Sequence, residues 1–262
     1  MDIIKSKDNN KIKYVRSLNS KKSRDEENAF IVEGIKFVKE AIKEKAHIIY
    51  LIFNEGSMNK TEIQELIELN SDIENKIVIC QDNVFNSIAD TINAQGVLAV
   101  IKKNKNQHHM VDYKFIVYCD RIQDPGNLGT IIRTVDAFGP GLVILNKGCV
   151  DLYNNKVVRA SAGAIFRVPF INQALDDEML QKLKLEGFTI ISTVVESELS
   201  FEDIEKYEKI CVVIGNEGQG VSQEIRSNSH MNITIKMSGN AESLNASIAA
   251  GISIYEIRKK LL

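Results

Sequence analysis

Three polar segments of this chain hold residue types that could bind a ligand and do chemistry on it. They span residues 120–134, 215–222 and 235–247. The second and third segments follow apolar runs, at Ile210 to Ile214 and Ile233 to Met237, that are typical of buried parallel strands. Because ligands of open α/β sheets bind outside the carboxyl ends of strands, these segments predict a binding site.

The second segment combines glycines with polar side chains. Gly215 and Gly218 flank Asn216-Glu217, and a glycine lets backbone amides and carbonyls approach a ligand without a Cβ in the way. The pattern by itself also fits an ordinary turn between a strand and a helix. It is neither a Walker phosphate loop, which needs Gly-Lys-Ser/Thr, nor the Gly-x-Gly-x-x-Gly order of a dinucleotide fold. ATP and NAD are therefore not the expected ligands.

The first segment carries an asparagine and an arginine at the start of a predicted helix. Asn127 follows Asp124-Pro125-Gly126 and is predicted to be the N-cap of that helix. Arg133 lies six residues further, on the side opposite Ile131 and Ile132. On pattern alone, a capping asparagine and an exposed arginine explain these two residues.

The third segment leads into the final helix. Ser243 and Asn245 lie where this helix is predicted to begin, and a helix start presents unpaired amides as well as polar side chains. Capping and ligand binding are therefore compatible roles. The apolar residues with helical spacing are Leu244, Ile248, Ile252 and Tyr255. This stripe fits either the core or a contact with a second subunit.

The composition is that of a globular protein large enough for two domains. The chain has 262 residues, of which 44% are hydrophobic. Its first residues lack the apolar core of a signal peptide, and no apolar run is long enough to span a bilayer, so we expect a cytoplasmic protein without a membrane partner. The histidines form no ligand pattern, and no metal site is expected. The cysteines, expected to be reduced core thiols, are Cys80, Cys119, Cys149 and Cys211.

The charge is unevenly distributed, although the net charge is only -2. Residues 1–24 hold eight Lys or Arg residues against Asp2 and Asp8. Such an excess fits a surface that faces nucleic-acid phosphates, because lysine and arginine replace condensed counterions. It also fits a solvated amino-terminal arm.

The coarse order of elements predicts two α/β domains. Helices are expected at 33–45, 61–69 and 83–89, and strands at 48–53, 76–80 and 96–101. A polar stretch at 102–109 is the expected linker, which gives domains 1–108 and 109–262. In the second domain we expect strands at 115–119, 142–145, 189–194, 210–214 and 233–237. This pattern predicts a mostly parallel sheet covered on both faces.

The three polar segments together closely resemble the motifs of the SpoU (TrmH-like) RNA 2'-O-ribose methyltransferases of the SPOUT superfamily. The match covers about 150 residues at the carboxyl terminus, in the family's order, and three ordered sites are far more specific than one short motif. The resemblance implies a deep trefoil knot, S-adenosylmethionine as methyl donor, and a homodimer whose active sites draw on both chains. The reaction needs no metal.

The resemblance also extends to the front domain and to one segment of the second. Lys21-Lys22-Ser23-Arg24, followed by Phe30 to Gly34, is similar to the front domain of relatives, which resembles a ribosomal RNA-binding fold and docks substrate RNA. Residues 155–164 resemble the family's Lys/Arg-x-Ser-x-Gly-Ala stretch. The implied RNA-binding residues are Lys21, Lys22, Arg24, Arg159 and Ser161.

The family motifs assign roles to individual residues of the three segments. The implied catalytic residues are Asn127, Arg133, Glu217, Ser243 and Asn245. The implied cofactor-binding residues are Thr193, Gly215, Asn216, Gly218, Ile235, Met237 and Leu244. For Arg133 the sequence leaves two roles open. A guanidinium with a pKa above about 12 is a poor general base, and gripping a phosphate beside the target ribose is physically easier.

The resemblance favours ribosomal RNA, and 23S rRNA in particular, as the substrate. Relatives with a front domain often modify large-subunit RNA, and those without one more often modify transfer RNA. A tRNA methyltransferase and a non-catalytic ribosome-assembly factor on the same fold are the alternatives. The assembly factor predicts decayed cofactor loops, yet all the motif residues are present. A nucleotide-dependent oxidoreductase is disfavoured by the missing phosphate fingerprint.

Overall fold

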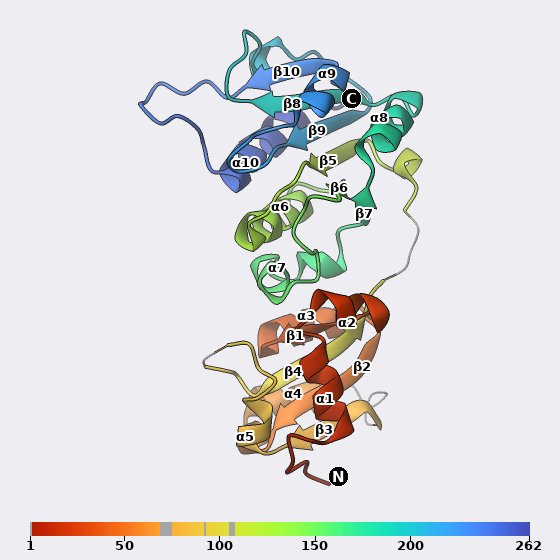
Figure 1. The fold of residues 1–262 in the computed structure, drawn as a ribbon, viewed down its shortest axis with the longest axis vertical. Helices are drawn as coiled ribbons and strands as arrows, with labels where there is room; N and C mark the ends of the chain where they lie inside the picture. The colour runs from red at the N-terminus through yellow and green to blue at the C-terminus, as the bar shows by residue number, and fades with distance from the viewer. Residues whose placement is uncertain (1, 69–74, 92, 105–107) are drawn as a thin grey trace. The chain divides into compact units, whose positions relative to one another are not determined.

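The computed structural model describes residues 2–68, 75–91, 93–104 and 108–262, and the chain forms two compact units. Unit 1 comprises Met1–Lys105 and Tyr153–Phe166, and unit 2 comprises Asn106–Leu152 and Arg167–Leu262. The sequence patterns do not anticipate that Tyr153–Phe166, which lies within the second domain in chain order, groups with the first unit. Each unit is built around one sheet (Figure 1).

Unit 1 contains a mixed four-stranded sheet in the order β1-β4-β2-β3. The strands are β1 (Ala29–Glu33), β2 (Ile48–Asn54), β3 (Ile77–Cys80) and β4 (Val97–Lys102). Strand β4 pairs antiparallel with β1 and β2, while β3 pairs parallel with β2. The helices are α1 (Asn10–Ser17), α2 (Lys21–Glu26), α3 (Ile35–Lys43), α4 (Thr61–Glu68), α5 (Asp82–Phe85) and, from the second stretch of the unit, α7 (Asn155–Ala160).

The amino-terminal segment of unit 1 is more ordered than its charge suggested. Helices α1 and α2 and strand β1 were not predicted, because the basic residues conceal a short apolar series. Ile12 and Val15 of α1 are fully buried in the core cluster of this unit, and the helix is capped by Asn9, whose side chain accepts from the Lys11 amide. The predicted helix 33–45 starts later, at Ile35, because Glu33 ends β1. Residue 69, the predicted end of α4, lies outside the described residues.

Unit 2 contains a six-stranded sheet in the order β10-β8-β9-β5-β6-β7, and every pairing in it is parallel. The strands are β5 (Phe115–Cys119), β6 (Leu142–Asn146), β7 (Phe170–Ala174), β8 (Thr189–Val194), β9 (Ile210–Ile214) and β10 (Met231–Thr234). The predicted parallel α/β sheet is confirmed. Edge strand β7 was not predicted, since only its first two residues are large and apolar.

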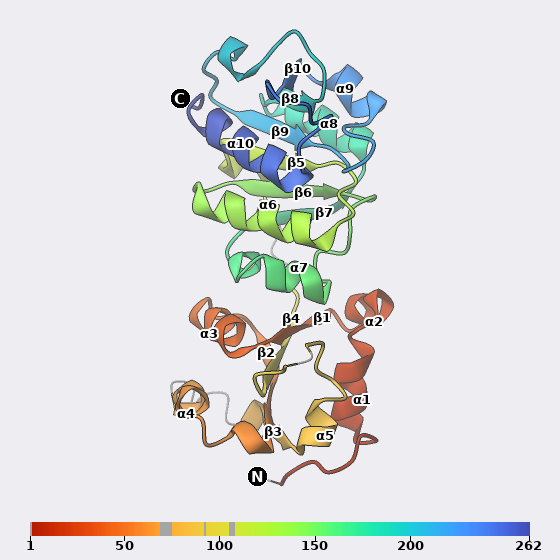
Figure 2. The same ribbon diagram turned by 90° about the vertical axis from the view of Figure 1, so that its left-hand side faces the viewer.

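Helices cover both faces of this sheet, as predicted. They are α6 (Pro125–Ala137), α8 (Asp176–Leu185), α9 (Gln223–Asn228) and α10 (Ala246–Arg258). Figure 2 shows α6 and α10 side by side on one face. On the other face, Leu183 of α8 and Ile225 of α9 join a core cluster with Ile116 and Tyr118 of β5. Successive strand residues point to opposite faces, so a strand buried throughout needs this double cover.

The strand order places the loops of the three polar segments at one edge of the sheet. The chain runs outward from β5 through β6 to β7, whereas β9, β8 and β10 lie on the other side of β5. The order therefore reverses between β5 and β9, and the carboxyl ends at such a switch point form the usual ligand crevice of open α/β sheets. Residues 120–124 follow β5 there, and residues 215–222 follow β9.

The structure describes no helix that is long and apolar enough to cross a membrane. All four cysteines are free and buried, in agreement with the prediction of reduced core thiols. Burial raises the pKa of Cys80 and Cys149 to about 12.

Candidate functional site

A cavity of about 470 Å³ lies in unit 2 among the loops that follow β8, β9 and β10. Its size is within the usual range of small-molecule sites, roughly 300–1,000 Å³. Every residue predicted to bind the cofactor lines it, namely Thr193, Gly215, Asn216, Gly218, Ile235, Met237 and Leu244. Two of the predicted catalytic residues, Glu217 and Ser243, line it as well. The fold therefore brings the second and third polar segments together.

The loop after β9 closes on itself through backbone bonds. The Asn216 amide donates to the Gly220 carbonyl at 3.1 Å, and the Gly220 amide returns a bond of 2.9 Å. The Asn216 side-chain oxygen accepts from the amides of Gly218 and Gln219, each at 3.0 Å. At Gly215 a Cβ would stand 2.1 Å from the Val221 amide nitrogen, so only glycine fits this close approach.

Strand β10 is shorter than predicted, and this change shapes the cavity. It ends at Thr234, so the predicted strand residues Ile235 to Met237 leave the sheet. Ile235 and Met237 then line the cavity, because their side chains are no longer committed to a strand face. On the opposite wall, the Thr193 hydroxyl donates to the Val213 carbonyl at 2.9 Å. Thr193 thus contributes its apolar surface and backbone rather than a free hydroxyl.

Glu217 joins the loop after β9 to the start of α6. Its carboxylate accepts from the Gln123 amide at 3.1 Å, from the Asp124 amide at 3.0 Å and from the Asn127 side-chain nitrogen at 3.0 Å. Burial opposes ionisation of Glu217, but these bonds, that from Asn127 first, outweigh it and hold the pKa of the carboxyl below its ordinary value. Glu217 is therefore an anion at neutral pH.

Asn127 and Asn245 extend this contact to the third segment. The Asn245 side-chain nitrogen donates to the Asn127 side-chain oxygen at 3.0 Å, and Asn245 caps α10 by accepting from the Ser247 amide at 2.9 Å. The predicted capping role of Asn245 is confirmed. The predicted capping role of Asn127 is wrong, because α6 begins three residues earlier, with Asp124 as its cap. Asn127 is instead inside the first turn, with its side chain free to bridge Glu217 and Asn245.

Arg133 stands apart from this chain of contacts. It is exposed on α6 and does not line the cavity. Among the residues that the structure describes, no hydrogen bond or ion pair involves its guanidinium. The side chain is consequently available to an external anion.

The predicted RNA-binding residues of unit 1 fall into two groups. Lys21 and Lys22 are exposed in the first turn of α2. Arg24 is only 4% exposed and donates to the carbonyls of Leu18 at 2.8 Å and Asn19 at 2.9 Å. Burial commits its guanidinium to the fold, so the prediction that Arg24 contacts RNA is corrected.

The two predicted RNA contacts of the 155–164 segment also have partners within unit 1. Ser161 is fully buried, and its hydroxyl donates to the Val158 carbonyl at 2.8 Å, so it has no surface to offer RNA. This prediction is corrected as well. Arg159 is partly exposed and forms an ion pair with Asp90.

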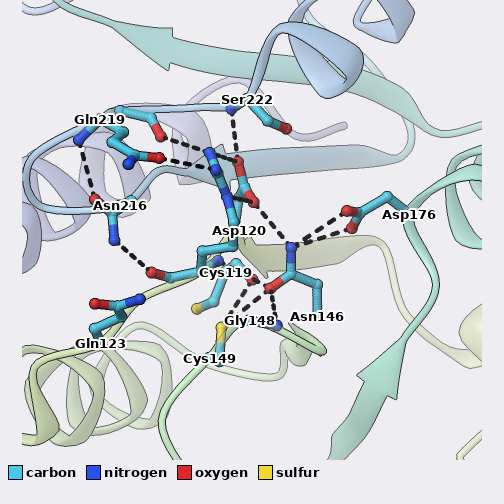
Figure 3. Close-up of polar contacts among 12 residues, drawn as sticks. Cys119, Asp120, Gln123, Asn146, Gly148, Cys149, Asp176, Asn216, Gln219 and Ser222 are labelled. Carbon is cyan, nitrogen blue, oxygen red and sulfur yellow. Dashed lines mark hydrogen bonds and ion pairs between the residues drawn. The ribbon is translucent and has the colours of Figure 1, made fainter.

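The sequence analysis did not predict a polar cluster that contacts the loop after β9, residues 215–222 (Figure 3). It centres on Asp120 and Arg121, which follow β5, and on Asn146, which ends β6. Asp120 is fully buried and accepts from the Asn146 side chain at 2.8 Å. The available signal was a polar residue directly after each of two neighbouring apolar runs, but nothing local indicated that the two meet.

The described residues contain no group of three or more His, Cys, Asp or Glu side chains arranged to hold a metal ion. The site instead consists of a cavity with glycine-rich and apolar walls, a carboxylate and two asparagines at its edge, and an exposed arginine nearby in the chain. Fold and site together define a binding centre of small-molecule size at the carboxyl ends of β8, β9 and β10 in a parallel α/β sheet.

Comparisons with known proteins agree with this geometry. Residues 114–255 match the SpoU rRNA Methylase family, and residues 9–99 match the MRM3-like substrate binding domain. The chain belongs to the SpoU rRNA methylase family. The predicted family and the predicted enzyme class, an RNA methyltransferase, are therefore confirmed.

Individual relatives match the chain from end to end. The 23S rRNA (guanosine(2553)-2'-O)-methyltransferase RlmP of Bacillus subtilis is 30% identical, over 98% of this chain and 100% of the relative. The crystal structure of an AdoMet-bound rRNA methyltransferase from Sinorhizobium meliloti superposes with a TM-score of 0.86 at 28% identity, covering 100% of this chain and 98% of that one. The AdoMet complex of the SpoU methyltransferase AviRb from Streptomyces viridochromogenes, at 23% identity and a TM-score of 0.84, shares the fold over 96% of this chain and 97% of that one.

Proposed function

We propose that this enzyme transfers a methyl group from S-adenosylmethionine to a ribose 2'-hydroxyl of 23S rRNA. The observation that carries the proposal is the cavity at the carboxyl ends of β8, β9 and β10, which the predicted cofactor residues line and beside which Glu217, Asn127 and Asn245 are joined. The relative from Bacillus subtilis, which matches along its full length, is named as a 2'-O-methyltransferase of a guanosine in 23S rRNA. Its substrate supports the same class of substrate here.

The cavity fits S-adenosylmethionine, whose sulfonium supplies an activated methyl group. Ile214, Ile235 and Leu244 offer apolar surface to an adenine ring, and the glycine loop brings backbone groups to the edge of the cavity without side chains. Gly218 has open space where a Cβ would be, with only the Asn216 side-chain oxygen within 4 Å, at 3.8 Å. Binding largely through backbone is expected from such walls, and it orients the donor rather than activating it further.

We propose that the polar residues at the cavity edge hold the ribose. Asn127 is fixed from both sides, by Glu217 and by Asn245, so its position at the start of α6 is preorganised. Ser243 lines the cavity from the third segment and is exposed to an incoming substrate. We assign Asn127, Ser243 and Asn245 to substrate orientation, and Glu217 to holding Asn127 and the cofactor loop together.

For Arg133 we favour a phosphate grip over a general base. A guanidinium is a poor general base, so we do not assign the hydroxyl proton to Arg133. It can bind a phosphate next to the target ribose with two parallel hydrogen bonds. The 2'-hydroxyl proton then leaves to that phosphate or to water.

We propose that the boundary between the two domains lies near residue 108 and that each domain has its own role. Residues 1–108 dock the RNA, which the match of residues 9–99 to a substrate binding domain supports, and residues 109–262 bind the methyl donor. Lys21 and Lys22 are the exposed basic residues that we assign to RNA phosphates. Arg159 joins them only if its ion pair with Asp90 opens. Because the relative from Bacillus subtilis is bacterial, and bacterial ribosomal RNA is made in the cytoplasm, we place the enzyme there.

We further propose a homodimer and a trefoil knot, as family membership implies. Apolar side chains on α10 support an interface: Ile248 is 54% exposed and Tyr255 is 49% exposed, so these predicted stripe residues are not core. Tyr255 also contacts exposed Phe138, with ring centroids 5.7 Å apart, which widens the apolar surface. Sedimentation should therefore detect a dimer, and an active monomer at working concentration would remove this proposal.

Transfer of labelled methyl from S-adenosylmethionine tests the main proposal. Unmodified 23S rRNA, 16S rRNA and transfer RNA are offered separately, and nuclease mapping locates the product. A 2'-O-methylated nucleotide in 23S rRNA is expected. Transfer to tRNA alone would favour the tRNA alternative, and donor binding without transfer to any of these RNAs would favour a different substrate or the assembly-factor alternative.

A further inference from the structure

Asp120 is the centre of a buried polar cluster that lies behind the cavity loop (Figure 3). Its carboxylate is fully buried at the end of β5 and accepts four hydrogen bonds. Two come from Arg121, from Nε at 2.9 Å and from Nη2 at 3.3 Å. The others come from the Asn146 side chain at 2.8 Å and the Ser222 amide at 2.7 Å. A buried carboxylate with this many donors is fixed in place and fixes its donors in turn.

Arg121 connects this cluster to the loop after β9 by hydrogen bonds. Nη1 of its guanidinium donates to the Gln219 side-chain oxygen at 3.0 Å, and Nη2 donates to the Gly220 carbonyl at 3.5 Å. The Arg121 carbonyl accepts from the Asn216 side chain at 2.8 Å. One residue thus contacts the loop at its start and at its end, while Glu217 at its tip contacts α6.

The backbone of Arg121 is itself in an unusual conformation. Its φ of +56° lies in the left-handed region, which costs a residue other than glycine free energy. The Arg121 amide donates to the Asn146 side-chain oxygen at 2.9 Å, which helps to hold this conformation. Asn146 therefore orients both the backbone of Arg121 and the carboxylate that faces its guanidinium.

Gly148 provides the space for the Arg121 side chain. A Cβ on Gly148 would stand 2.3 Å from the Arg121 Cγ and 3.0 Å from its Cβ, which is too close for the side chain to keep its position. Gly148 has an ordinary φ, so alanine suits its backbone. An alanine there would displace Arg121 without removing a single polar atom.

We propose that Arg121 is a positioning residue for the methyl donor. It holds residues 216–220 in the shape that forms one wall of the cavity, and Asp120 orients its guanidinium for this task. The inference rests on the proposed function, since the cavity is taken to bind S-adenosylmethionine. It predicts that Arg121 acts on donor affinity and on the placement of Glu217, and that it has no part in RNA docking.

A double-mutant cycle between Arg121 and Gly148 tests the inference. Calorimetry with S-adenosylmethionine is made on the full-length wild type, Arg121→Ala, Gly148→Ala and the double variant. Because charge-assisted bonds to the loop are lost, we expect Arg121→Ala to raise the Kd about tenfold or more. Gly148→Ala should produce a similar rise alone and add little in the Arg121→Ala background, since the side chain that it displaces is then absent.

Three further measurements separate positioning from general structural damage. Arg121→Lys keeps the charge but not the fork, so it should bind S-adenosylmethionine as weakly as Arg121→Ala. In methyl transfer, the KM for the donor should rise while the KM for RNA stays within about twofold of the wild type. Lys147→Ala, which removes an exposed side chain beside Gly148, should leave the donor Kd unchanged. Thermal melting identifies any variant that fails to fold. If Arg121→Ala fails to fold, the donor affinities of Gly148→Ala and Arg121→Lys test the inference in its place.

The outcomes distinguish this inference from the function on which it rests. A wild type that binds no S-adenosylmethionine would overturn the proposed function. If the wild type binds it and the folded Arg121 and Gly148 variants bind it equally well, the positioning role is wrong. Full additivity of the two substitutions would also overturn it, because Gly148 would then act by another route.

Discussion

The exposed lysines of α2 in unit 1 and the polar groups around the cavity in unit 2 are used in opposite ways. In unit 1 the exposed cations Lys21 and Lys22 project from the surface with no more than a distant partner, such as Glu26 at 3.8 Å from Lys22. In unit 2 the polar groups around the cavity bond mainly to one another, as Glu217 and Asn127 do. The first arrangement suits a long, variable polyanion, whose binding depends on salt. The second suits a single small ligand and a single reacting atom, because the groups are already in place.

Of the changes considered, loss of Arg133 should lower the rate of methyl transfer most. We expect Arg133→Ala to lower kcat by about a thousandfold, as removal of a group that binds the reacting centre commonly does. The Kd of S-adenosylmethionine should stay within about twofold, since Arg133 does not line the cavity. Single-turnover methyl transfer and calorimetry provide the two values. Weakened donor binding would instead assign Arg133 to the cofactor pocket.

Glu217→Gln tests whether the mutual bonding around the cavity matters. Oε1 of Glu217 accepts from Asn127 and the Asp124 amide, and Oε2 accepts from the Gln123 amide, so an amide nitrogen in place of either oxygen faces a donor and loses at least one of these bonds. We expect kcat to fall about a hundredfold, because Asn127 loses its fixed position. Glu217→Asp, which keeps the charge on a shorter side chain, is the control and should lose less.

The same residue predicts a dependence on pH. The pKa of Glu217 is lowered in the folded protein. The contribution of its carboxylate to the free energy of unfolding is therefore complete above the ordinary glutamate pKa of about 4.3, and it is lost as the pH falls through the lower, folded value. In the folded protein, donor affinity should therefore be constant from neutral pH to below about 4.3 and decline only as the pH falls through the lower, folded pKa of Glu217. Calorimetry on Glu217→Gln should show no such decline, and a decline of equal size in that variant would refute the assignment.

Arg24→Ala tests whether a buried arginine of unit 1 stabilises the fold rather than binding RNA. Arg24→Ala removes buried bonds to the carbonyls of Leu18 and Asn19, so we expect a loss of about 2 kcal/mol in the free energy of unfolding. RNA affinity of the folded protein should not change. Denaturant unfolding and filter binding measure these quantities, and a large loss of RNA affinity at unchanged stability would restore Arg24 to the RNA surface.

Substitution of both exposed lysines should have the smallest effect. Lys21→Ala combined with Lys22→Ala removes two phosphate contacts, so we expect RNA affinity to fall by about threefold to tenfold at low salt. The slope of log Kd against log salt should decrease in magnitude by about 1.4, the value for two contacts to a single strand. Stability should be unaffected. An unchanged slope in salt titrations would mean that these lysines are merely solvated.

The amino-acid sequence by itself determined the sheet of unit 2 and the composition of its site. Most of its strands are apolar runs, and polar or glycine-rich loops follow them, so periodicity predicts most of the elements. The cavity-lining residues were predicted from the resemblance of these loops to the SpoU motifs. These signals are local. The short edge strand β7 and the helices of the basic amino-terminal segment were missed, because their apolar residues are few and lie among charged or polar residues.

Only the tertiary structure decided how the polar residues are paired. Asn245 bonds to Asn127 across 118 residues of chain, and Ser222 bonds to Asp120 across 102. No pattern within a helix or a loop encodes such distant partners. Burial is equally non-local: the cations Lys22 and Arg24 lie only two positions apart, yet packing of α2 exposes one and encloses the other. A side chain's type is written in the sequence, whereas its task depends on which surface the rest of the chain covers.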